Sequence, residues 1–228
     1  MQPSQNETPP TACDKTIGDI DAGEGWALGL MRKIAEKQMD SKASLRARML
    51  AQRDALAADR RIEMSLAMAE IAEAISFDPG AAIAGYLPIR SEPDLRPLMA
   101  RLRERGARLC LPVVLDRETI VFRDFVRGAE LAKTGFGTTG PGPDAEVLDP
   151  DILLMPLAAF DAKGNRLGYG AGHYDRAIAR LRGKGLSPRL IGAAFSFQET
   201  DAVPAEAHDV PLTMILTEAG LRSFPQSL

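Results

Sequence analysis

Hydrophobic positions repeat with two different periods along the chain. Short apolar runs that suit buried strands occur at residues 81–86, 108–114, 151–155, 189–194 and 213–217. Residues 119–125 alternate apolar and polar side chains, as a half-buried strand does. Between these runs apolar residues recur every three or four positions, which predicts helices over residues 41–57, 60–75 and 91–105 and from 173 onward. Residues 133–150 are rich in glycine and proline and predict a long loop.

Strands that alternate with helices define the fold class. The pattern predicts an α/β protein, a single-domain open, largely parallel (mixed) sheet with helices on both faces, formed by residues 41–228. In such sheets ligands bind outside the carboxyl ends of the strands, so the loops after residues 86, 113 and 155 are the places to look. Residues 1–40 are polar and aperiodic, and we expect a disordered or loosely docked extension there. Met31 and Met39 leave the start of translation open.

The helix expected at residues 41–57 carries two stripes. Leu45, Met49 and Leu56 lie close together on one face at helical spacing, after Ser41 as N-cap. Cations repeat the same spacing directly beside this apolar stripe, at Lys42, Arg46 and Arg53. Such a row is most often a solvated face, but it can equally border a cleft and bind anions. Both interpretations stay open from the residues alone.

The next helix is expected to bury an apolar face. Its members are Ile62, Leu66, Ala69 and Ala74. The apolar run that contains Cys110 makes this cysteine a buried strand residue rather than a nucleophile.

Composition and charge exclude several classes of partner. The formal net charge is -3, so no cationic face for non-specific nucleic-acid binding is expected. No apolar run approaches the roughly 20 residues of a membrane-spanning helix. Two cysteines and the lack of a secretory signal favour a reducing cytoplasm.

Three glycines mark the segment with the densest chemical signal. Gly168, Gly170 and Gly172 alternate just before the helix that begins near His173. Missing side chains let backbone N–H groups approach an anion, and the N-terminus of the helix adds free N–H groups and a favourable dipole. The spacing matches neither the P-loop nor the dinucleotide fingerprint, so a tight helix entry explains the glycines equally well.

Two carboxylates near this segment are candidates for a metal site. Asp175 lies in the first turn of the helix, where an acid is favoured by the dipole in any case. Asp209 lies in a loop before the last strand, where aspartate often only caps a turn. Together they could hold Mg²⁺, which takes one or two carboxylates together with water and phosphate oxygens.

The residues from 160 to 176 resemble a known family. They read Phe-Asp-Ala-Lys-Gly-Asn-Arg-Leu-Gly-Tyr-Gly-Ala-Gly-His-Tyr-Asp-Arg, which is similar to the hallmark of the 5-formyltetrahydrofolate cyclo-ligase (5,10-methenyltetrahydrofolate synthetase) family. Weaker features agree in the same order along residues 41–220, namely the basic helix with Lys42, Arg46 and Arg53, the segment Tyr86-Leu-Pro88 with Glu92, and the pair His208-Asp209.

The resemblance implies an ATP- and Mg²⁺-dependent enzyme. It implies conversion of 5-formyltetrahydrofolate to 5,10-methenyltetrahydrofolate with release of ADP and phosphate, by phosphorylation of the formyl oxygen and ring closure by N10. We expect a monomer whose partners are ATP and a small folate, without nucleic acid or membrane. No side chain is implied as a nucleophile.

The resemblance also assigns roles to individual residues. The expected ATP contacts are Lys42, Arg46, Arg166, Leu167, Gly168, Tyr169, Gly170, Ala171, Gly172, His173 and Tyr174. The expected folate contacts are Leu87, Glu92, Tyr169, Gly170, Ala171, Gly172 and His173. The expected Mg²⁺ ligands are Asp175 and Asp209.

The chain departs from the family pattern at a few positions, and two other functions compete. His173 stands where many relatives have tyrosine, and Thr213 stands where relatives often have an acid. One alternative is a folate- or nucleotide-binding relative without turnover. Against it argue the retained residues Lys42, Arg46, Glu92, Asp175 and Asp209. The other is a dinucleotide-dependent oxidoreductase, against which the glycine spacing argues.

Overall fold

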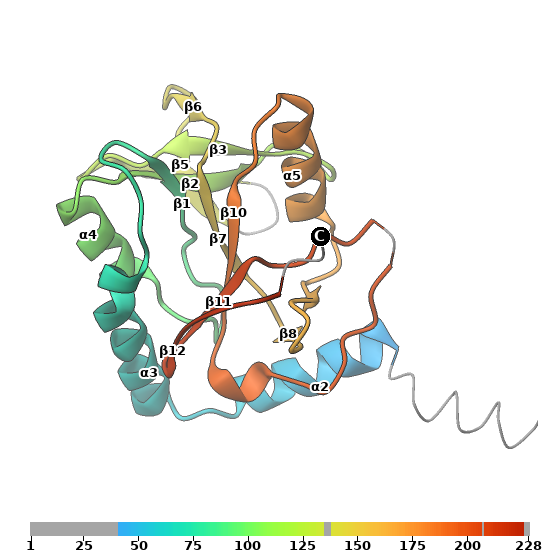
Figure 1. The fold of residues 1–228 in the computed structure, drawn as a ribbon. Helices are drawn as coiled ribbons and strands as arrows, with labels where there is room; N and C mark the ends of the chain where they lie inside the picture. The colour runs from blue at the N-terminus through green and yellow to red at the C-terminus, as the bar shows by residue number, and fades with distance from the viewer. Residues whose placement is uncertain (1–40, 135–137, 207, 226–228) are drawn as a thin grey trace, which may run out of the picture. The chain divides into compact units, whose positions relative to one another are not determined.

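Eight strands form one mixed sheet at the centre of the fold (Figure 1). The computed structural model describes residues 41–134, 138–206 and 208–225, so the extension expected at residues 1–40 lies outside the described residues. The strand order is β12-β11-β10-β7-β1-β2-β3-β6. These strands are β1 (Ala82–Ala84), β2 (Arg108–Val114), β3 (Ile120–Asp124), β6 (Val147–Leu148), β7 (Ile152–Pro156), β10 (Arg189–Ala193), β11 (Met214–Thr217) and β12 (Gly220–Ser223).

The middle of the sheet is parallel and its edges are antiparallel. Strands β11, β10, β7, β1 and β2 pair in parallel, with Leu154 opposite Ile191 and Ile83 opposite Ile152. Strands β12, β3 and β6 add antiparallel edges. The expected α/β class with a largely parallel, mixed sheet is therefore confirmed.

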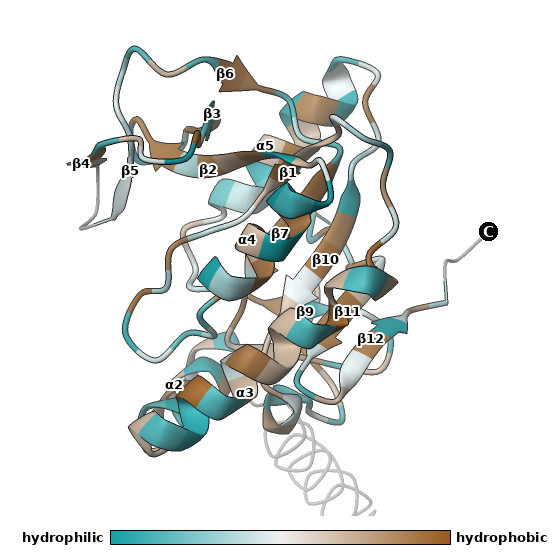
Figure 2. Cartoon of the chain, turned by 90° about the vertical axis from the view of Figure 1, so that its left-hand side faces the viewer, coloured by the Kyte–Doolittle hydropathy of each residue, from teal (hydrophilic) through white to brown (hydrophobic). Residues whose placement is uncertain are grey.

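Helices cover both faces of the sheet because its central strands are buried on both sides. Helices α3 (Ala58–Glu70) and α4 (Arg96–Glu104), with the 3₁₀ turn η1 (Ile71–Ala74), lie on one face, and α5 (His173–Gly183) lies on the other (Figure 1). Alternate residues of β7 serve the two faces, since Leu154 joins the first apolar cluster and Leu153 the second. In Figure 2 the central strands β7 and β10 are mostly apolar.

Helix α2 (Lys42–Asp54) packs at the carboxyl ends of the parallel strands. Ser41 caps it, since its Oγ accepts a hydrogen bond from the amide of Ser44 at 3.1 Å. Leu45 and Met49 are buried in a small cluster with Ala159 and Leu167, which belong to the hairpin β8 (Ala159–Phe160) and β9 (Arg166–Leu167). Burying two such side chains stabilises this docking by about 1.5–3 kcal/mol each. The apolar stripe of α2 thus fixes where its cationic stripe lies.

Two expectations about local structure were wrong. In α3, Ala69 of the expected row is buried, but Ile62 is 60% exposed and Leu66 is 50% exposed, whereas Met64 and Met68 are buried. The alternative apolar row, which contains the two methionines, faces the sheet instead. Residues 133–150 are also more than a loop, because β5 (Thr139–Pro141) pairs with β4 (Leu131–Lys133) and β6 joins the main sheet.

The connections that leave β1 and β7 lead to opposite sides along the sheet. Strand β1 leads through α4 to its neighbour β2, and β7 leads through α5 to its other neighbour β10. Because α4 and α5 lie on opposite faces, the chain leaves β1 and β7 toward opposite sides of the sheet, and in such sheets the ligand crevice is expected at this carboxyl edge. The segments after residues 86 and 155 therefore meet at the point where ligands bind in this class of fold.

Candidate active site

A buried aspartate shapes the chain that leads to the glycine loop, the name used here for residues 168–172. Asp161 is 2% exposed, and its Oδ1 accepts hydrogen bonds from the amides of Lys163 at 2.9 Å and Asn165 at 3.0 Å. Its Oδ2 accepts one from the amide of Val203 at 3.0 Å. These bonds close the turn between β8 and β9, so that the chain leaves β9 directly into the glycine loop.

Two positions of the glycine loop require glycine. Gly170 has a φ of +99° and Gly172 a φ of +65°, both in the left-handed region that side chains rarely adopt. A Cβ at Gly172 would lie 2.8 Å from Nη1 of Arg176. Gly172 is also the N-cap of α5 and provides no side-chain cap, and the N-terminus of a helix is a place where anions can bind.

The cationic stripe of α2 faces the glycine loop and its neighbours. Nε of Arg46 donates to the carbonyl oxygen of Gly168 at 2.7 Å. Nζ of Lys42 lies 2.6 Å from Oδ2 of Asp209 and 3.0 Å from Oε1 of Glu206. Arg46 and Lys42 therefore contact the glycine loop and the loop before β11, and anion binding by this stripe stays a prediction.

The two candidate metal ligands lie in adjoining segments. Oδ1 of Asp175 is 2.5 Å from Nη2 of Arg166. The same oxygen accepts a hydrogen bond from the amide of Val210 at 3.3 Å, and Val210 is the residue that follows Asp209. Burial favours a raised pKa for Asp209, but the hydrogen bond from Lys42 holds this pKa below its ordinary value. The same contact raises the pKa of Lys42 despite its partial burial. Both carboxylates are therefore paired with cations on the wall of one crevice.

The donor set at this point fits Mg²⁺ rather than a metal that needs a full protein cage. Within residues 41–134, 138–206 and 208–225, no group of three His, Cys, Asp or Glu side chains is arranged to hold a metal. Two carboxylates can hold Mg²⁺ when water and phosphate oxygens complete the shell. The pair Asp175 and Asp209 remains a prediction on these terms.

Glu92 is a buried carboxylate on the other side of the crevice. It is 3% exposed, accepts the amide of Ile89 at 2.8 Å, and accepts a hydrogen bond from the hydroxyl of Tyr169. Burial raises the pKa of Glu92, and the two hydrogen bonds and the charge of Arg53 offset part of this rise. Leu87 lies in the same segment and packs against the first apolar cluster.

Arg53 joins four segments around Glu92, and the sequence assigned it no role of its own. It is 0% exposed and donates to Oγ of Ser91 at 3.0 Å, to the carbonyl oxygen of Leu157 at 3.3 Å and to the hydroxyl of Tyr169 at 2.5 Å. It therefore ties α2 to the loops after β1 and β7 and to the glycine loop. Its position in the cationic stripe was the only signal for this role.

His173 and Thr213, the departures from the family pattern, have local partners. Nε2 of His173 lies 3.0 Å from the carbonyl oxygen of Arg117, in the loop between β2 and β3. The hydroxyl of Thr213 donates to the carbonyl oxygen of Leu190 at 2.8 Å and accepts the amide of Leu190 at 3.0 Å. Cys110 is buried in β2, as expected, and burial raises the pKa of its thiol to about 12.

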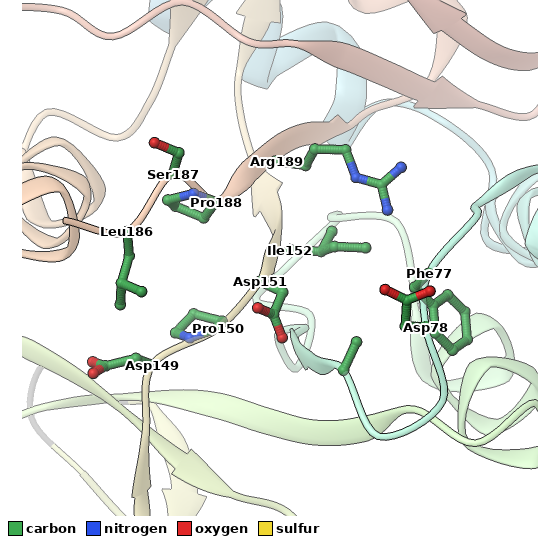
Figure 3. Close-up of a pocket in the computed structure, with 11 residues that line it drawn as sticks. Phe77, Asp78, Asp149, Pro150, Asp151, Ile152, Leu186, Ser187, Pro188 and Arg189 are labelled. Atoms are coloured by element: carbon green, nitrogen blue, oxygen red, sulfur yellow. The ribbon is translucent and has the colours of Figure 1, made fainter. Parts of the chain in front are cut away.

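A hollow lies at the opposite end of the strands from this site. A cavity of about 400 Å³ lies beside the amino ends of β7 and β10 (Figure 3). Its polar groups serve the fold, since Oδ2 of Asp151 accepts the amide of Ala82 at 2.8 Å and Arg189 donates to the carbonyl oxygen of Ser76. A smaller hollow of about 220 Å³ adjoins Glu92 between α3 and the loop after β1. The charged groups at the carboxyl edge, rather than cavity size, identify the site.

The fold and this edge define an α/β protein with a glycine loop and charged side chains beside the carboxyl ends of its parallel strands. The model of the 5-formyltetrahydrofolate cyclo-ligase family matches residues 38–218. The 5-formyltetrahydrofolate cyclo-ligase of Mycolicibacterium smegmatis is 34% identical over 146 residues, which cover 60% of this chain and 74% of the relative. The chain belongs to the 5-formyltetrahydrofolate cyclo-ligase family.

Solved structures agree with this assignment. The 5,10-methenyltetrahydrofolate synthetase of Aquifex aeolicus matches with a TM-score of 0.69 and 29% identity, over 82% of this chain and 95% of that one. The synthetase of Mycoplasma pneumoniae matches with a TM-score of 0.63 and 26% identity, over 79% and 99% of the two chains. The expected family, fold and enzyme class are confirmed. Among the described residues no helix is long and apolar enough to cross a membrane.

Proposed function

We propose that this chain converts 5-formyltetrahydrofolate to 5,10-methenyltetrahydrofolate with ATP and Mg²⁺, releasing ADP and phosphate. One observation carries the proposal. The glycine loop contacts the cation Arg46 through Gly168 and the buried carboxylate Glu92 through Tyr169. A single loop thus forms the wall between an anion-binding half and a half suited to N–H donors.

The nucleotide half combines side-chain cations with backbone amides. We assign the ATP contacts to Lys42, Arg46, Arg166, Leu167, Gly168, Tyr169, Gly170, Ala171, Gly172, His173 and Tyr174. Lys42 and Arg46 extend from α2 toward the phosphates, and the uncapped amides at the start of α5 add fixed donors. Transfer of a phosphoryl group needs positioning and charge neutralisation more than a side-chain nucleophile.

Asp175 and Asp209 would hold Mg²⁺ in this proposal. The two carboxylates form ion pairs with Arg166 and Lys42. A bound metal would neutralise part of the carboxylate charge that these two cations neutralise now. Bound Mg²⁺ would supply charge neutralisation at the phosphates. Lys42 would then be released from Asp209 and could contact phosphate oxygen itself.

The folate half is assigned to Leu87, Glu92 and residues 169–173. The buried carboxylate of Glu92 would accept hydrogen bonds from the adjacent N–H groups of a pterin ring, which are paired donors. Leu87 offers an apolar surface beside it. The formyl group on N5 would then point across the glycine loop toward the γ-phosphate.

The proposed reaction has two steps. The formyl oxygen attacks the γ-phosphorus, the bond to the β-phosphate oxygen breaks, and ADP leaves. N10 then attacks the carbon that carries the phosphorylated oxygen, the carbon–oxygen bond breaks, and phosphate leaves with the former formyl oxygen and the proton from N10 as the methenyl bridge forms. The chain orients N5 and the γ-phosphate across one loop and neutralises charge, so none of its side chains becomes covalently modified.

The near-ultraviolet absorbance of the methenyl bridge tests the proposal. The chain should give product from 5-formyltetrahydrofolate only when ATP and Mg²⁺ are both present, with one ADP per methenyl group. Glu92→Gln should raise the KM for the folate more than that for ATP. A folded chain that binds folate or ATP but forms no product would support the binding relative without turnover instead.

We also infer a cytoplasmic monomer that takes folate and ATP as its small-molecule partners. A buried free thiol at Cys110 suits a reducing compartment. Elution of the full chain at twice its mass of 24.6 kDa in size-exclusion chromatography would overturn the monomer.

A further inference from the structure

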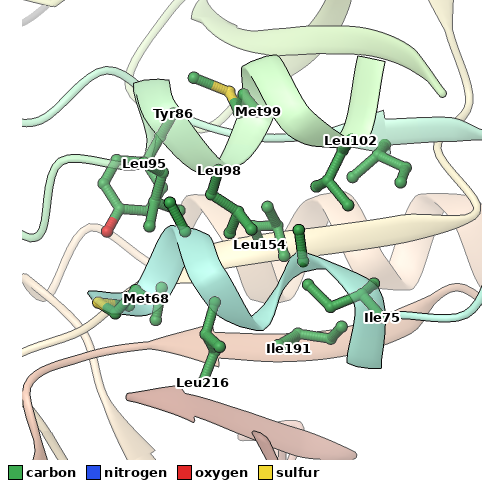
Figure 4. Packing of buried hydrophobic residues seen from close by; sticks show 14 of the residues in the cluster. Met68, Ile75, Tyr86, Leu95, Leu98, Met99, Leu102, Leu154, Ile191 and Leu216 are labelled. Atoms are coloured by element: carbon green, nitrogen blue, oxygen red, sulfur yellow. The ribbon is translucent and has the colours of Figure 1, made fainter. Parts of the chain in front are cut away.

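Tyr86 has a buried hydroxyl without a hydrogen-bond partner. The residue follows β1, is 3% exposed, and its ring packs in the first apolar cluster beside Met68 and Leu95 (Figure 4). Among the described residues its Oη and Nε of Arg123 are the two buried side-chain polar atoms without a partner. Phenylalanine would fill the same space in the apolar cluster without this oxygen.

A buried hydroxyl that lacks a partner is unfavourable, so its position calls for an explanation. Arg123 lies on β3, near the edge of the sheet, whereas Tyr86 leads directly into the segment with Leu87 and Glu92. The charges of Glu92 and Arg53 act on the hydroxyl of Tyr86, so this oxygen lies near the side chains where the folate is expected.

The surroundings of Tyr86 make its hydroxyl a donor. Burial raises the pKa of Tyr86 well above its ordinary value, and the negative charge of Glu92 raises it further. The charge of Arg53 opposes this rise only in part. Tyr86 thus keeps its proton at any physiological pH, beside a carboxylate that only accepts hydrogen bonds.

We propose that Tyr86 determines specificity for the pterin ring by donating a hydrogen bond to its 4-oxo group. The inference rests on the proposed folate site. A pterin carries the N3–H donor and the C4 carbonyl acceptor side by side, so a carboxylate and a neighbouring hydroxyl donor match this edge together. Glu92 would accept from the N–H groups, and Tyr86 would recognise the adjacent oxygen.

Tyr169 controls access to this pair. Tyr169 belongs to the glycine loop, and its hydroxyl donates a hydrogen bond to Glu92. The residue is 40% exposed. A pterin that bonds to Glu92 must displace this hydroxyl, which can keep Arg53 as its partner. Displacement would open the carboxylate and the hydroxyl of Tyr86 to the same ligand.

Equilibrium binding of folic acid and of its 4-amino analogue to the full chain tests the proposal, because the two differ at position 4. In isothermal titration calorimetry, Tyr86→Phe should weaken folic acid roughly tenfold and the 4-amino analogue less than about twofold. Urea unfolding should show that the variant is as stable as the wild type or more so, since a buried unpaired hydroxyl is removed. Arg123→Met is the matched control, and it should leave both affinities unchanged.

Other outcomes would overturn the role. Equal weakening of both ligands, no weakening of either, or a loss of stability with unchanged binding would each make Tyr86 a packing residue. The readout is binding, so a wild-type chain that binds folic acid without forming product would overturn the proposed catalysis alone. A wild-type chain that binds neither ligand would overturn the folate site and this inference together.

Discussion

Replacing Arg53 with methionine removes the guanidinium that joins α2 to the two halves of the site. The change keeps a long apolar side chain in a position that is 0% exposed. It removes hydrogen bonds to Ser91, Leu157 and Tyr169. The loss of stability depends on whether these three partners keep other hydrogen bonds.

The partners of Arg53 are not left without hydrogen bonds. The carbonyl oxygen of Leu157 still accepts Nε2 of Gln198 at 2.9 Å, Ser91 still donates to Asp54, and Tyr169 still donates to Glu92. Hydrogen bonds to a charged group contribute about 1.5–3 kcal/mol each, and removing the need to bury the guanidinium offsets part of the loss. We expect the free energy of unfolding to fall by about 3 kcal/mol.

Urea unfolding followed by circular dichroism measures this change. Arg48→Met on the exposed side of the same helix is the matched control, and it should stay within about 0.5 kcal/mol of the wild type. Arg53→Lys should recover little, because one ammonium group cannot reach all three acceptors. A loss for Arg53→Met no larger than that of the control would refute the role of Arg53 as the link between these segments.

Three further predictions concern the nucleotide half. Lys42→Ala should raise the KM for ATP and leave the equilibrium affinity for folate unchanged, because Lys42 borders the crevice beside Asp209. Asp175→Asn should raise the Mg²⁺ and ATP requirement more than the folate KM. Since the folded pKa of Asp209 is lowered below 3.8, its pairing with Lys42 stabilises the fold above the unfolded-state pKa. This contribution, at most about 1 kcal/mol, is lost as the pH falls through the lower folded value, and Asp209→Asn should remove that pH dependence from the unfolding free energy.

Each of these predictions has an outcome that contradicts it. An unchanged KM for ATP in Lys42→Ala would mean that Lys42 belongs to a solvated face and does not contact ATP. Equal losses of nucleotide and folate affinity in Asp175→Asn would point to a general disturbance of α5. For Asp209, urea titrations from neutral to acidic pH in which wild type and variant differ by a constant amount would show that the pair with Lys42 contributes no pH-dependent stability.

Periodicity in the sequence predicted the central architecture well. The strand at residues 108–114 and the helix start at His173 agree with β2 and α5. Periodicity failed in α3, where two apolar rows compete and only the packing of the folded chain selects the row with Met64 and Met68 over that with Ile62 and Leu66. Local pattern cannot tell which row faces the sheet when both are apolar.

The site was predictable in its parts rather than in its connections. The glycines and Asp175 share one short segment, so the sequence places them together. The spacing of Lys42, Arg46 and Arg53 gave a stripe but not its direction, which follows from the burial of Leu45 and Met49 against β8 and β9. A buried arginine also runs against ordinary burial preferences, so nothing local could assign Arg53 to Tyr169 and Ser91.

The fate of the formyl oxygen tests the central claim most directly. With oxygen-18 in the formyl group of 5-formyltetrahydrofolate, the released phosphate should carry the label, one atom per methenyl group formed, in the presence of ATP and Mg²⁺. Product formed without label in phosphate would contradict phosphoryl transfer to the formyl oxygen across the glycine loop.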